Sequence, residues 1–324
     1  MKRLLSGSKD LSELVEKITW SGDTRQVARK LTFTIAQKAS DIYLPKVDLE
    51  TGADVLFLEG ETVLFGGIIF DKEKSSSGET VSYSAFDLLF FLNNSQVSRI
   101  YDDTAENIAA SVCSDLFVTL GSAAATGVRV YMPCFGKTGY EAIMMAYTEA
   151  SHTTEKPYLP VIKNVNEVHV IEKGEWCGVV LEGTYNLEDT KYQESLEKMV
   201  NRVIITDKNG NAVSAVEDPD TLKFGIVQKV YKQEEGKEAA VEAKAMLQGM
   251  ERSGSVTALS DDRAVSGYSI AIQDEISGLY GLFFIESDTH TYANGKEEMQ
   301  LTLAFSNIMD EKEIERTEET KTKT

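Results

Sequence analysis

The chain has 324 residues, of which 42% are hydrophobic and 9% aromatic, and these are the proportions of folded globular domains rather than of disordered or collagen-like chains. At about 150 residues per domain, this length predicts about two domains, each large enough to bury its own core. The 52 acidic and 33 basic residues give a formal net charge of −19, which excludes a protein that grips nucleic acid through a broad basic surface.

The sequence also predicts the cellular compartment in which the chain folds. Its first ten residues lack the apolar run of a secretion signal, and no stretch approaches the ~20 apolar residues of a membrane-spanning helix, so we expect no membrane insertion. Cys113, Cys134 and Cys177 are an odd number without C-x-x-C spacing, which predicts neither a disulfide framework nor a structural zinc site. Such cysteines suit a reducing cytoplasm.

Residues 1–95 are predicted to form a first β-rich domain. The paired Gly66 and Gly67 indicate a bulge or bend within it, and Glu59-Gly60-Glu61 has the length and glycine of a hairpin connection. Strands at this spacing are typical of a sandwich or barrel. Alternating or continuous apolar runs place its strands at residues 30–35, 54–58, 62–70 and 80–86.

Residues 96–183 are predicted to form a small α/β insertion domain. Apolar residues recur every four positions in residues 104–116, which predicts an amphipathic helix with Thr104 as its N-cap. A second helix is predicted over residues 139–150, and a strand over residues 167–171.

Residues 184–309 are predicted to form a second β-rich domain with a helical excursion near residues 235–253. Asn209-Gly210 favours a hairpin because both residues tolerate the positive φ of a type I′ turn. The charged residues 310–324 are expected to be a disordered tail. The strands of this section are predicted at residues 201–207, 224–231, 269–272, 281–285 and 299–305.

Cysteine and histidine do not indicate a catalytic site. Cys113 lies on the apolar side of a predicted helix, and Cys134 follows a proline in a segment that may be exposed but has no local histidine to activate it. Asp288 and His290 are two residues apart, so on a strand they would share a face and could pair, although turn hydrogen bonds explain them equally well. The three histidines are too far apart in sequence to predict a His-rich metal site.

Other catalytic motifs are also missing. An acid pair for glycan cleavage could be drawn from residues 102–103, Glu141 and Glu149, but such coincidences are expected among 52 acids. Gly136-Lys137-Thr138 would need a glycine five residues before Gly136 to form a phosphate-binding loop, and Tyr131 stands there. Neither G-x-S-x-G nor H-E-x-x-H occurs. The sequence therefore predicts no catalytic residue, no cofactor and no metal site.

Five segments carry a family resemblance, and they occur in the family's order. They are Ile18 to Phe33, Phe65 to Phe70, Phe86 to Asn94, Tyr192 to Arg202, and Asp288 to Tyr292 together with Met299 to Phe305. With these segments the chain resembles the XkdQ/YqbQ family of hub proteins from defective-prophage and phage tails. The resemblance spans roughly residues 14–305.

The resemblance implies an α+β, predominantly β fold with two tail-tube-like antiparallel β-barrels and the small α/β insertion domain. It implies a non-enzymatic baseplate hub of a contractile phage tail or phage-tail-like bacteriocin, in which a homotrimer adapts the sixfold tail tube to the threefold spike. The expected partners are then the spike protein, a tail-tube or tube-initiator protein, the tape-measure protein and baseplate wedge proteins. The chain would assemble in the bacterial cytoplasm and end in the virion tail or a released tail-like particle.

We expect Trp20, Arg25, Arg29 and Trp176 at subunit interfaces, because Trp and Arg are enriched among residues that dominate binding. For Trp20, burial as the cap of a barrel is an equally open alternative. Two other functions stay open: a peptidoglycan-hydrolysing or glycan-binding tail protein, and a tail-tube or tube-initiator protein in sixfold rings. If three subunits enclose a channel, acid-rich walls would let DNA or a tape-measure protein pass without sticking.

Overall fold

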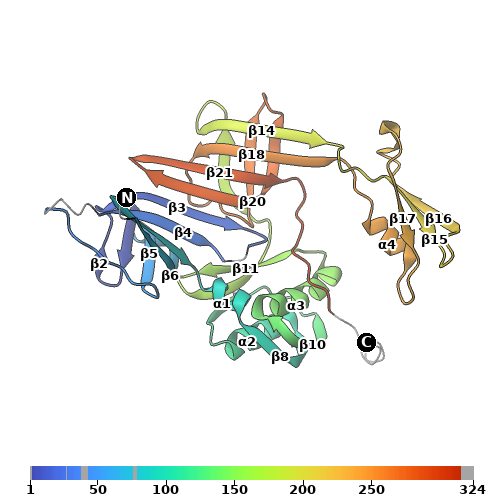
Figure 1. The fold of residues 1–324 in the computed structure, drawn as a ribbon, viewed down its shortest axis with the longest axis horizontal. Coiled ribbons are helices and arrows are strands. Elements are labelled where there is room, and N and C mark those ends of the chain that lie inside the picture. Colours follow the sequence, from blue (N-terminus) through green and yellow to red (C-terminus); the bar gives the residue numbers. More distant parts are fainter. Residues whose placement is uncertain (1, 27, 38–42, 76–78, 315–324) are drawn as a thin grey trace. The chain divides into compact units, whose positions relative to one another are not determined.

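The structure, a computed structural model, describes residues 2–26, 28–37, 43–75 and 79–314 (Figure 1). Strands make up 52% of the described residues and helices 14%, which confirms the predicted predominance of β structure. Contacts divide the chain into two compact units. Unit 1 consists of residues 1–190 and 255–324, and unit 2 of residues 191–254. The domain boundaries predicted at residues 96, 184 and 310 remain a prediction.

The largest sheet has 13 strands, and it joins the first and last β-rich sections of the sequence. Its strand order is β14-β18-β21-β20-β3-β4-β7-β6-β5-β1-β2, and β19 pairs with both β20 and β13. The described strands thus form one open series, in which the β3–β20 pair links the two sections. Closure of each section into a barrel stays a prediction. The strands are β1 (Lys2–Ser6), β2 (Lys9–Asp10), β3 (Val15–Asp23), β4 (Lys30–Ala36), β5 (Asp54–Glu59), β6 (Thr62–Lys74), β7 (Thr80–Phe86), β13 (Trp176–Glu182), β14 (Leu187–Ser195), β18 (Glu251–Leu259), β19 (Ser269–Asp274), β20 (Leu279–Ala293) and β21 (Lys296–Ala304).

The alternating sequence of β4 explains how this sheet forms its core. Leu31, Phe33 and Ile35 are buried, while the residues between them are only partly covered, as the period of two requires. The Phe33 ring stacks on Tyr83 of β7, with ring centroids 5.1 Å apart. All four strands predicted in residues 1–95 are present, and β5 and β6 form the predicted antiparallel hairpin.

The glycine pair in β6 does not make the bulge that the sequence indicated. Gly66 and Gly67 lie in regular register opposite Leu56 and Val55 of β5. A Cβ on Gly66 would lie 2.6 Å from the side chain of Val165, in the turn between β11 and β12. Glycine is needed at position 66 because two segments approach closely. The register shift of this hairpin lies two residues earlier, between Val63 and Phe65.

Three helices and several short strands form a second core in unit 1. Residues from α2 and α3 dominate it, among them Ile108, Val112, Ile143 and Tyr147. Strands β8 and β10 form an antiparallel ribbon, and β11, β12 and β9 form a three-stranded sheet. The elements of this part are α1 (Leu89–Asn94), β8 (Gln96–Thr104), α2 (Ala105–Asp115), β9 (Leu120–Ala123), β10 (Arg129–Thr138), α3 (Gly139–Thr154), β11 (Tyr158–Lys163) and β12 (Glu167–Glu172).

The segment after β21 packs on this helical core. Met309 and Ile314 are buried in it. Tyr140 of α3 donates a hydrogen bond to Asp310 at 2.9 Å, and the Lys312 amide donates to the Thr148 hydroxyl at 3.0 Å. The sequence placed the start of a disordered tail at residue 310, whereas residues 310–314 are held by these contacts. Residues 315–324 lie outside the described part.

Unit 2 has a three-stranded sheet in the order β16-β15-β17 and one short helix. Its core contains Val203, Ile205 and Ala243. The predicted hairpin at Asn209-Gly210 is present between β15 and β16. Of these two residues only Gly210 has a positive φ, at +89°, so the turn is not the type I′ turn that the sequence suggested. The elements are β15 (Arg202–Thr206), β16 (Ala212–Glu217), the 3-10 turn Leu222–Phe224, β17 (Gln228–Lys232) and α4 (Ala239–Ala245). Across the described residues of both units, every helix is too short or too polar to cross a bilayer.

Candidate functional site: a buried polar network and an exposed apolar patch

The pairing of β3 with β20 builds a buried polar network. The register sets Trp20 opposite His290 and Gly22 opposite Asp288. A Cβ on Gly22 would lie 2.7 Å from the guanidinium carbon of Arg29, so the glycine leaves room for that side chain. Arg29, immediately before β4, therefore reaches Asp288 across the sheet surface.

Arg29 and Asp288 form the centre of this network. The guanidinium donates two hydrogen bonds to the carboxylate, one of them 3.0 Å long, and the Ser266 amide donates a third at 2.6 Å. The guanidinium carbon also lies 4.2 Å from the centre of the Trp20 ring, a cation–π contact. Asp288 is 1% exposed, so these donors take the place of water around its carboxyl group.

His290 extends the network as a neutral side chain. Its Nε2 lies 3.1 Å from the Ala264 carbonyl, which can only accept, so Nε2 carries the proton and Nδ1 accepts from the Ser260 hydroxyl at 2.8 Å. Burial lowers the pKa of His290, although Asp288 at 3.5 Å acts in the opposite direction. The sequence expectation that Asp288 and His290 share one face of a strand is confirmed. The hydrogen bonds of His290 go to Ala264 and Ser260 rather than to Asp288.

The network continues to the N-terminal strand. The Tyr292 hydroxyl donates to Asp262 at 2.7 Å, and Lys2 of β1 forms an ion pair with the same carboxylate. The Lys2 ammonium also lies 4.6 Å from the centre of the Tyr292 ring. Burial is the main reason that the pKa of Tyr292 is raised, so its hydroxyl stays a donor at neutral pH. These bonds connect segments about 260 residues apart in sequence. The charges of Lys2 and Asp262 are balanced by each other within the fold.

The structure separates the four residues expected at interfaces into two groups. Trp20 is 4% exposed, and Arg29 is held by Asp288, so both are part of the internal network. Arg25 is largely exposed and pairs with Glu286. Trp176 is 56% exposed on β13. Only Arg25 and Trp176 thus offer surface to a neighbour in this arrangement, and an interface role for any of the four remains a proposal.

Trp176 belongs to a larger apolar surface. Val180, Tyr280 and Leu282 are also exposed, at 37%, 67% and 57%. The register aligns Val180 and Leu282 on either side of Ala271 in β19, so their side chains share one sheet face. We call Trp176, Val180, Tyr280 and Leu282 the β13–β20 patch. The sequence predicted a strand over residues 281–285, but a continuous apolar run does not reveal which face is left uncovered.

The cysteines considered in the sequence are not activated nucleophiles. Cys113 and Cys134 are buried, so the expectation that Cys134 may be exposed is wrong. Burial raises the pKa of Cys113 to about 11, and it also raises the pKa values of Cys134 and Cys177. All three therefore remain thiols at neutral pH.

The acids considered for glycan cleavage have structural partners instead. Glu141 completes a capping box with Thr138 at the start of α3. Asp102 pairs with Arg129, and Asp103 accepts from Asn107 and the Thr104 amide. Thr104 is the N-cap of α2 as predicted, but its side chain makes no capping hydrogen bond.

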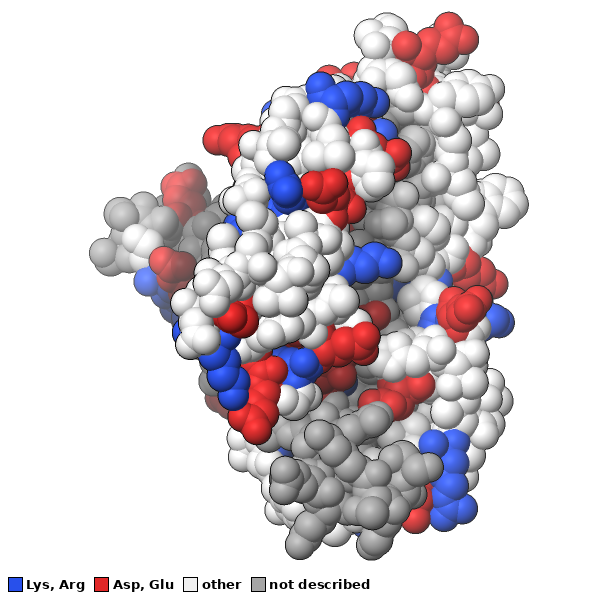
Figure 2. Space-filling view, turned by 90° about the vertical axis from the view of Figure 1, so that its right-hand side faces the viewer, with Lys and Arg blue, Asp and Glu red and all other residues white. Residues whose placement is uncertain are grey.

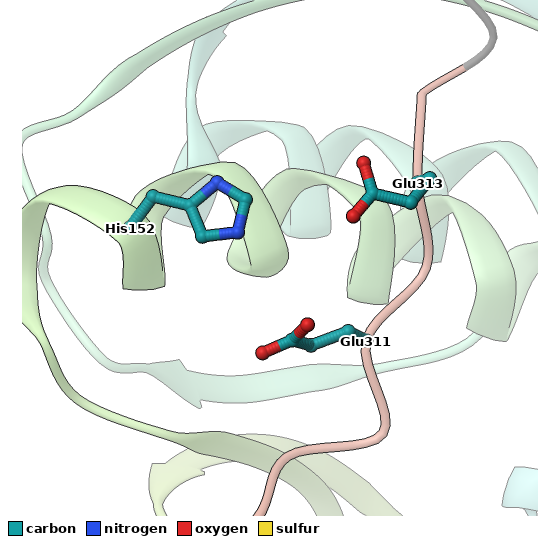
Figure 3. Close-up of side chains that lie close together, drawn as sticks. All are labelled: His152, Glu311 and Glu313. Atoms are coloured by element: carbon teal, nitrogen blue, oxygen red, sulfur yellow. The ribbon is translucent and has the colours of Figure 1, made fainter. Parts of the chain in front are cut away.

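One group of side chains has ligand atoms close enough to share a cation. His152 of α3 and Glu311 and Glu313 of the C-terminal segment have ligand atoms within 4.8 Å of one another (Figure 3). All three side chains are exposed. Such exposed acidic groups are common on protein surfaces, and this group by itself does not define a metal centre.

Charged side chains of both signs are mixed on one face of the molecule. On the face shown in Figure 2, acidic and basic residues are interspersed among uncharged ones. The formal charge of −19 is therefore not gathered into one acidic field on this face. An acid-rich channel wall stays a hypothesis.

Comparison with known proteins identifies the family. The model of the YQBQ-like family matches residues 18–304. The chain belongs to the YQBQ-like family. A sequence relative is the phage-like element PBSX protein XkdQ of Bacillus subtilis (strain 168), which is 23% identical and aligns over 93% of this chain and 95% of its own length.

Solved structures share the fold of this YQBQ-like chain. The 43 kDa tail protein of prophage MuSo2 from Shewanella oneidensis matches with a TM-score of 0.72 and 15% identity, covering 94% of this chain and 97% of its own. The tail protein from Neisseria meningitidis MC58 gives 0.65 and 15%, over 93% and 95%. The Escherichia coli c3393 protein, described as a type VI secretion component similar to the T4 tail proteins gp27 and gp5, gives 0.56 and 11%, over 97% and 79%. The chain thus has the fold of phage tail proteins.

Proposed function

We propose that this chain is the non-enzymatic hub of a contractile tail baseplate, in a phage or a phage-tail-like bacteriocin. Three copies form a ring that adapts the sixfold tail tube to the threefold spike. The observation that carries the proposal is membership of the YQBQ-like family, together with a fold shared with tail proteins over nearly the whole chain.

Two structural features support a role in assembly. The β13–β20 patch exposes large apolar side chains on one sheet face, which is typical of a surface that binds another protein. The hydrogen bonds of the Arg29–Asp288 network join segments distant in sequence. They stabilise strand β20, which carries part of the β13–β20 patch. We propose that the patch, with Trp176 at one side, contributes to contacts between copies of the chain, and that Arg25 extends them.

The hub would bind the spike protein below and the tail-tube or tube-initiator protein and tape-measure protein above, with baseplate wedge proteins around it. The likeness to the E. coli protein described as similar to gp27 and gp5 supports a spike partner. Assembly in the bacterial cytoplasm would precede incorporation into the tail. No sequence-specific contact with nucleic acid is part of the proposal.

The symmetry of the complex tests the proposal. The chain is co-expressed with the spike protein of the same particle, and the purified complex is imaged by electron microscopy. A threefold ring of this chain on a trimeric spike is the expected result. A sixfold ring without the spike would instead indicate a tail-tube or tube-initiator protein.

A second assay tests the enzymatic alternative. Incubation with purified peptidoglycan is expected to release no soluble fragments. Release that disappears when one acid is replaced, for example in Glu149→Gln, would show a hydrolase and contradict the non-enzymatic hub.

A further inference from the structure

The C-terminal segment after β21 lies against α3 and brings two carboxylates to a histidine. Met309 and Ile314 are buried in the helical core on either side of the two acids, so the course of the segment between them is fixed. Glu311 and Glu313 of this segment lie beside His152, in the last turn of α3. Figure 3 shows the imidazole ring and both carboxylates directed into one space.

Hydrogen bonds to α3 hold the segment in place. Asp310 accepts from the Tyr140 hydroxyl at 2.9 Å, and the Lys312 amide donates to the Thr148 hydroxyl at 3.0 Å. Tyr140, Thr148 and His152 lie four or eight residues apart and so follow one row along the helix. The fold therefore holds the two carboxylates beside the imidazole, which lowers the entropic cost of binding a shared ligand.

The space between the three side chains favours a cation. Within the described part of the chain, neither Glu311 nor Glu313 forms an ion pair with a lysine or arginine. Lys312, which stands between them in sequence, instead donates from its Nζ to Asp310 at 2.9 Å. His152 lies at the C-terminal end of α3, where the helix dipole adds partial negative charge. A bound cation would neutralise these groups.

The three ligand atoms are close enough to bind a single ion. They lie within 4.8 Å of one another, so a point between them is about 2.8 Å or less from each, against the ~2.0–2.2 Å of zinc bonds to nitrogen and carboxylate oxygen. Movement of each ligand atom by less than about 1 Å would thus complete the contacts. All three side chains are exposed and can rotate by this amount, and water would take the remaining positions on the ion.

We propose that His152, Glu311 and Glu313 bind a divalent transition-metal ion such as Zn²⁺, which fastens the C-terminal segment to α3. The imidazole distinguishes this group from a purely acidic cluster, because it favours such an ion over Mg²⁺ and Ca²⁺, which prefer oxygen ligands. The histidine and the glutamates are about 160 residues apart in sequence, so the spacing of the histidines could not reveal the site. The proposal does not depend on the proposed hub function.

NMR of the histidine side chains measures binding at this site directly. The chain has three histidines, and the imidazole resonances of His152 are those lost in His152→Gln. The full chain is titrated with ZnCl₂ and, separately, with MgCl₂ at neutral pH under reducing conditions. We expect the His152 resonances to respond saturably to one Zn²⁺ per chain and not to Mg²⁺, while those of His169 and His290 stay in place. No saturable response of His152 to Zn²⁺, or an equal response to Mg²⁺, would overturn the proposal.

Matched glutamate variants identify the other ligands. Loss of a residue that only supports a metal ligand typically weakens binding about 10–100-fold, so Glu311→Gln and Glu313→Gln should each weaken Zn²⁺ binding at least as much in isothermal titration calorimetry. Glu155→Gln removes the same charge from an exposed residue at the C-cap of α3 and should leave the affinity unchanged.

Two results of the calorimetry would refute the site. Equal losses in all three glutamate variants would show attraction to general negative charge rather than coordination. Unchanged affinity in Glu311→Gln and Glu313→Gln would show that the ion binds elsewhere. None of these outcomes bears on whether the chain forms a trimeric hub.

Discussion

Arg29 and Asp288 are 259 residues apart in sequence, yet the guanidinium of one donates two hydrogen bonds to the buried carboxylate of the other. The pair lies where β4 and β20 flank β3, so it ties the N-terminal β section to the C-terminal one. Because Asp288 is almost fully buried, its partner cannot be replaced by water.

Replacing Arg29 should therefore destabilise the fold strongly. Arg29→Met leaves a buried carboxylate without its cation, and breaking such a pair typically costs about 3–5 kcal/mol. Arg25→Met is the matched control, because Arg25 is mostly exposed and its pair with Glu286 should contribute less than about 1 kcal/mol. Urea unfolding of both variants measures the difference. Equal stabilities would show that the Arg29–Asp288 pair does not hold the two sections together.

Asp87 predicts an unusual pH dependence. Burial raises its pKa to about 7, although it accepts hydrogen bonds from the Arg29 and Leu89 amides. Between pH 4 and 7 the folded chain keeps a proton that the unfolded chain has released, so this group makes stability fall as pH rises. The total contribution is at most about 4 kcal/mol.

The comparison with Asp87→Asn isolates this contribution, since asparagine does not titrate. The free energy of unfolding of the native chain should fall relative to that of the variant from pH 4 to 7 and become constant above about pH 8. A difference that does not change with pH would contradict a protonated Asp87 in the fold.

Gly66 tests the contact between β6 and the β11–β12 turn. Gly66→Ala forces its new methyl group against Val165, and overpacking of this kind typically costs about 1–3 kcal/mol. Gly183→Ala is the control, because the nearest atom to its Cβ, an Asp274 oxygen, would lie at 3.8 Å. Thermal unfolding should show a lower melting temperature for Gly66→Ala only. Equal melting temperatures of the two variants would show that the β11–β12 turn moves away from the new methyl group without loss of stability.

The β13–β20 patch should affect assembly more than folding. Trp176→Ser removes a large exposed apolar side chain, which should weaken association about tenfold or more while the melting temperature of the isolated chain stays within a few degrees. Phe117→Ser changes another exposed aromatic residue, 97% accessible in the turn after α2, and should leave assembly intact. Sedimentation over a range of concentrations measures the association. Equal effects of the two substitutions would argue against the patch as an interface.

Local patterns in the sequence predicted local structure well. The alternation in residues 30–35 gave β4, the fourfold spacing in residues 104–116 gave α2, and Asn209-Gly210 gave the β15–β16 hairpin. The two-residue spacing of Asp288 and His290 correctly placed both on one face of β20. These features depend only on neighbours in the chain.

Features set by distant segments could not be predicted in this way. The β3–β20 pair is formed by strands more than 260 residues apart in sequence. The sequence suggested Arg29 as an interface residue, whereas in the fold it binds Asp288 of the distant strand β20. The packing of residues 310–314 on α3 depends on two apolar side chains, Met309 and Ile314, in a highly charged segment. The exposed face of β20 could not be foreseen either, because both of its faces carry apolar residues.

The mass of the assembled protein tests the central claim most directly. Light scattering after size exclusion is measured for the chain alone and after co-expression with the spike protein. The account predicts a complex that contains three copies of the 35.8 kDa chain for each spike trimer. A mass that corresponds to six copies without a spike, or a monomer that never binds the spike, would contradict the trimeric hub.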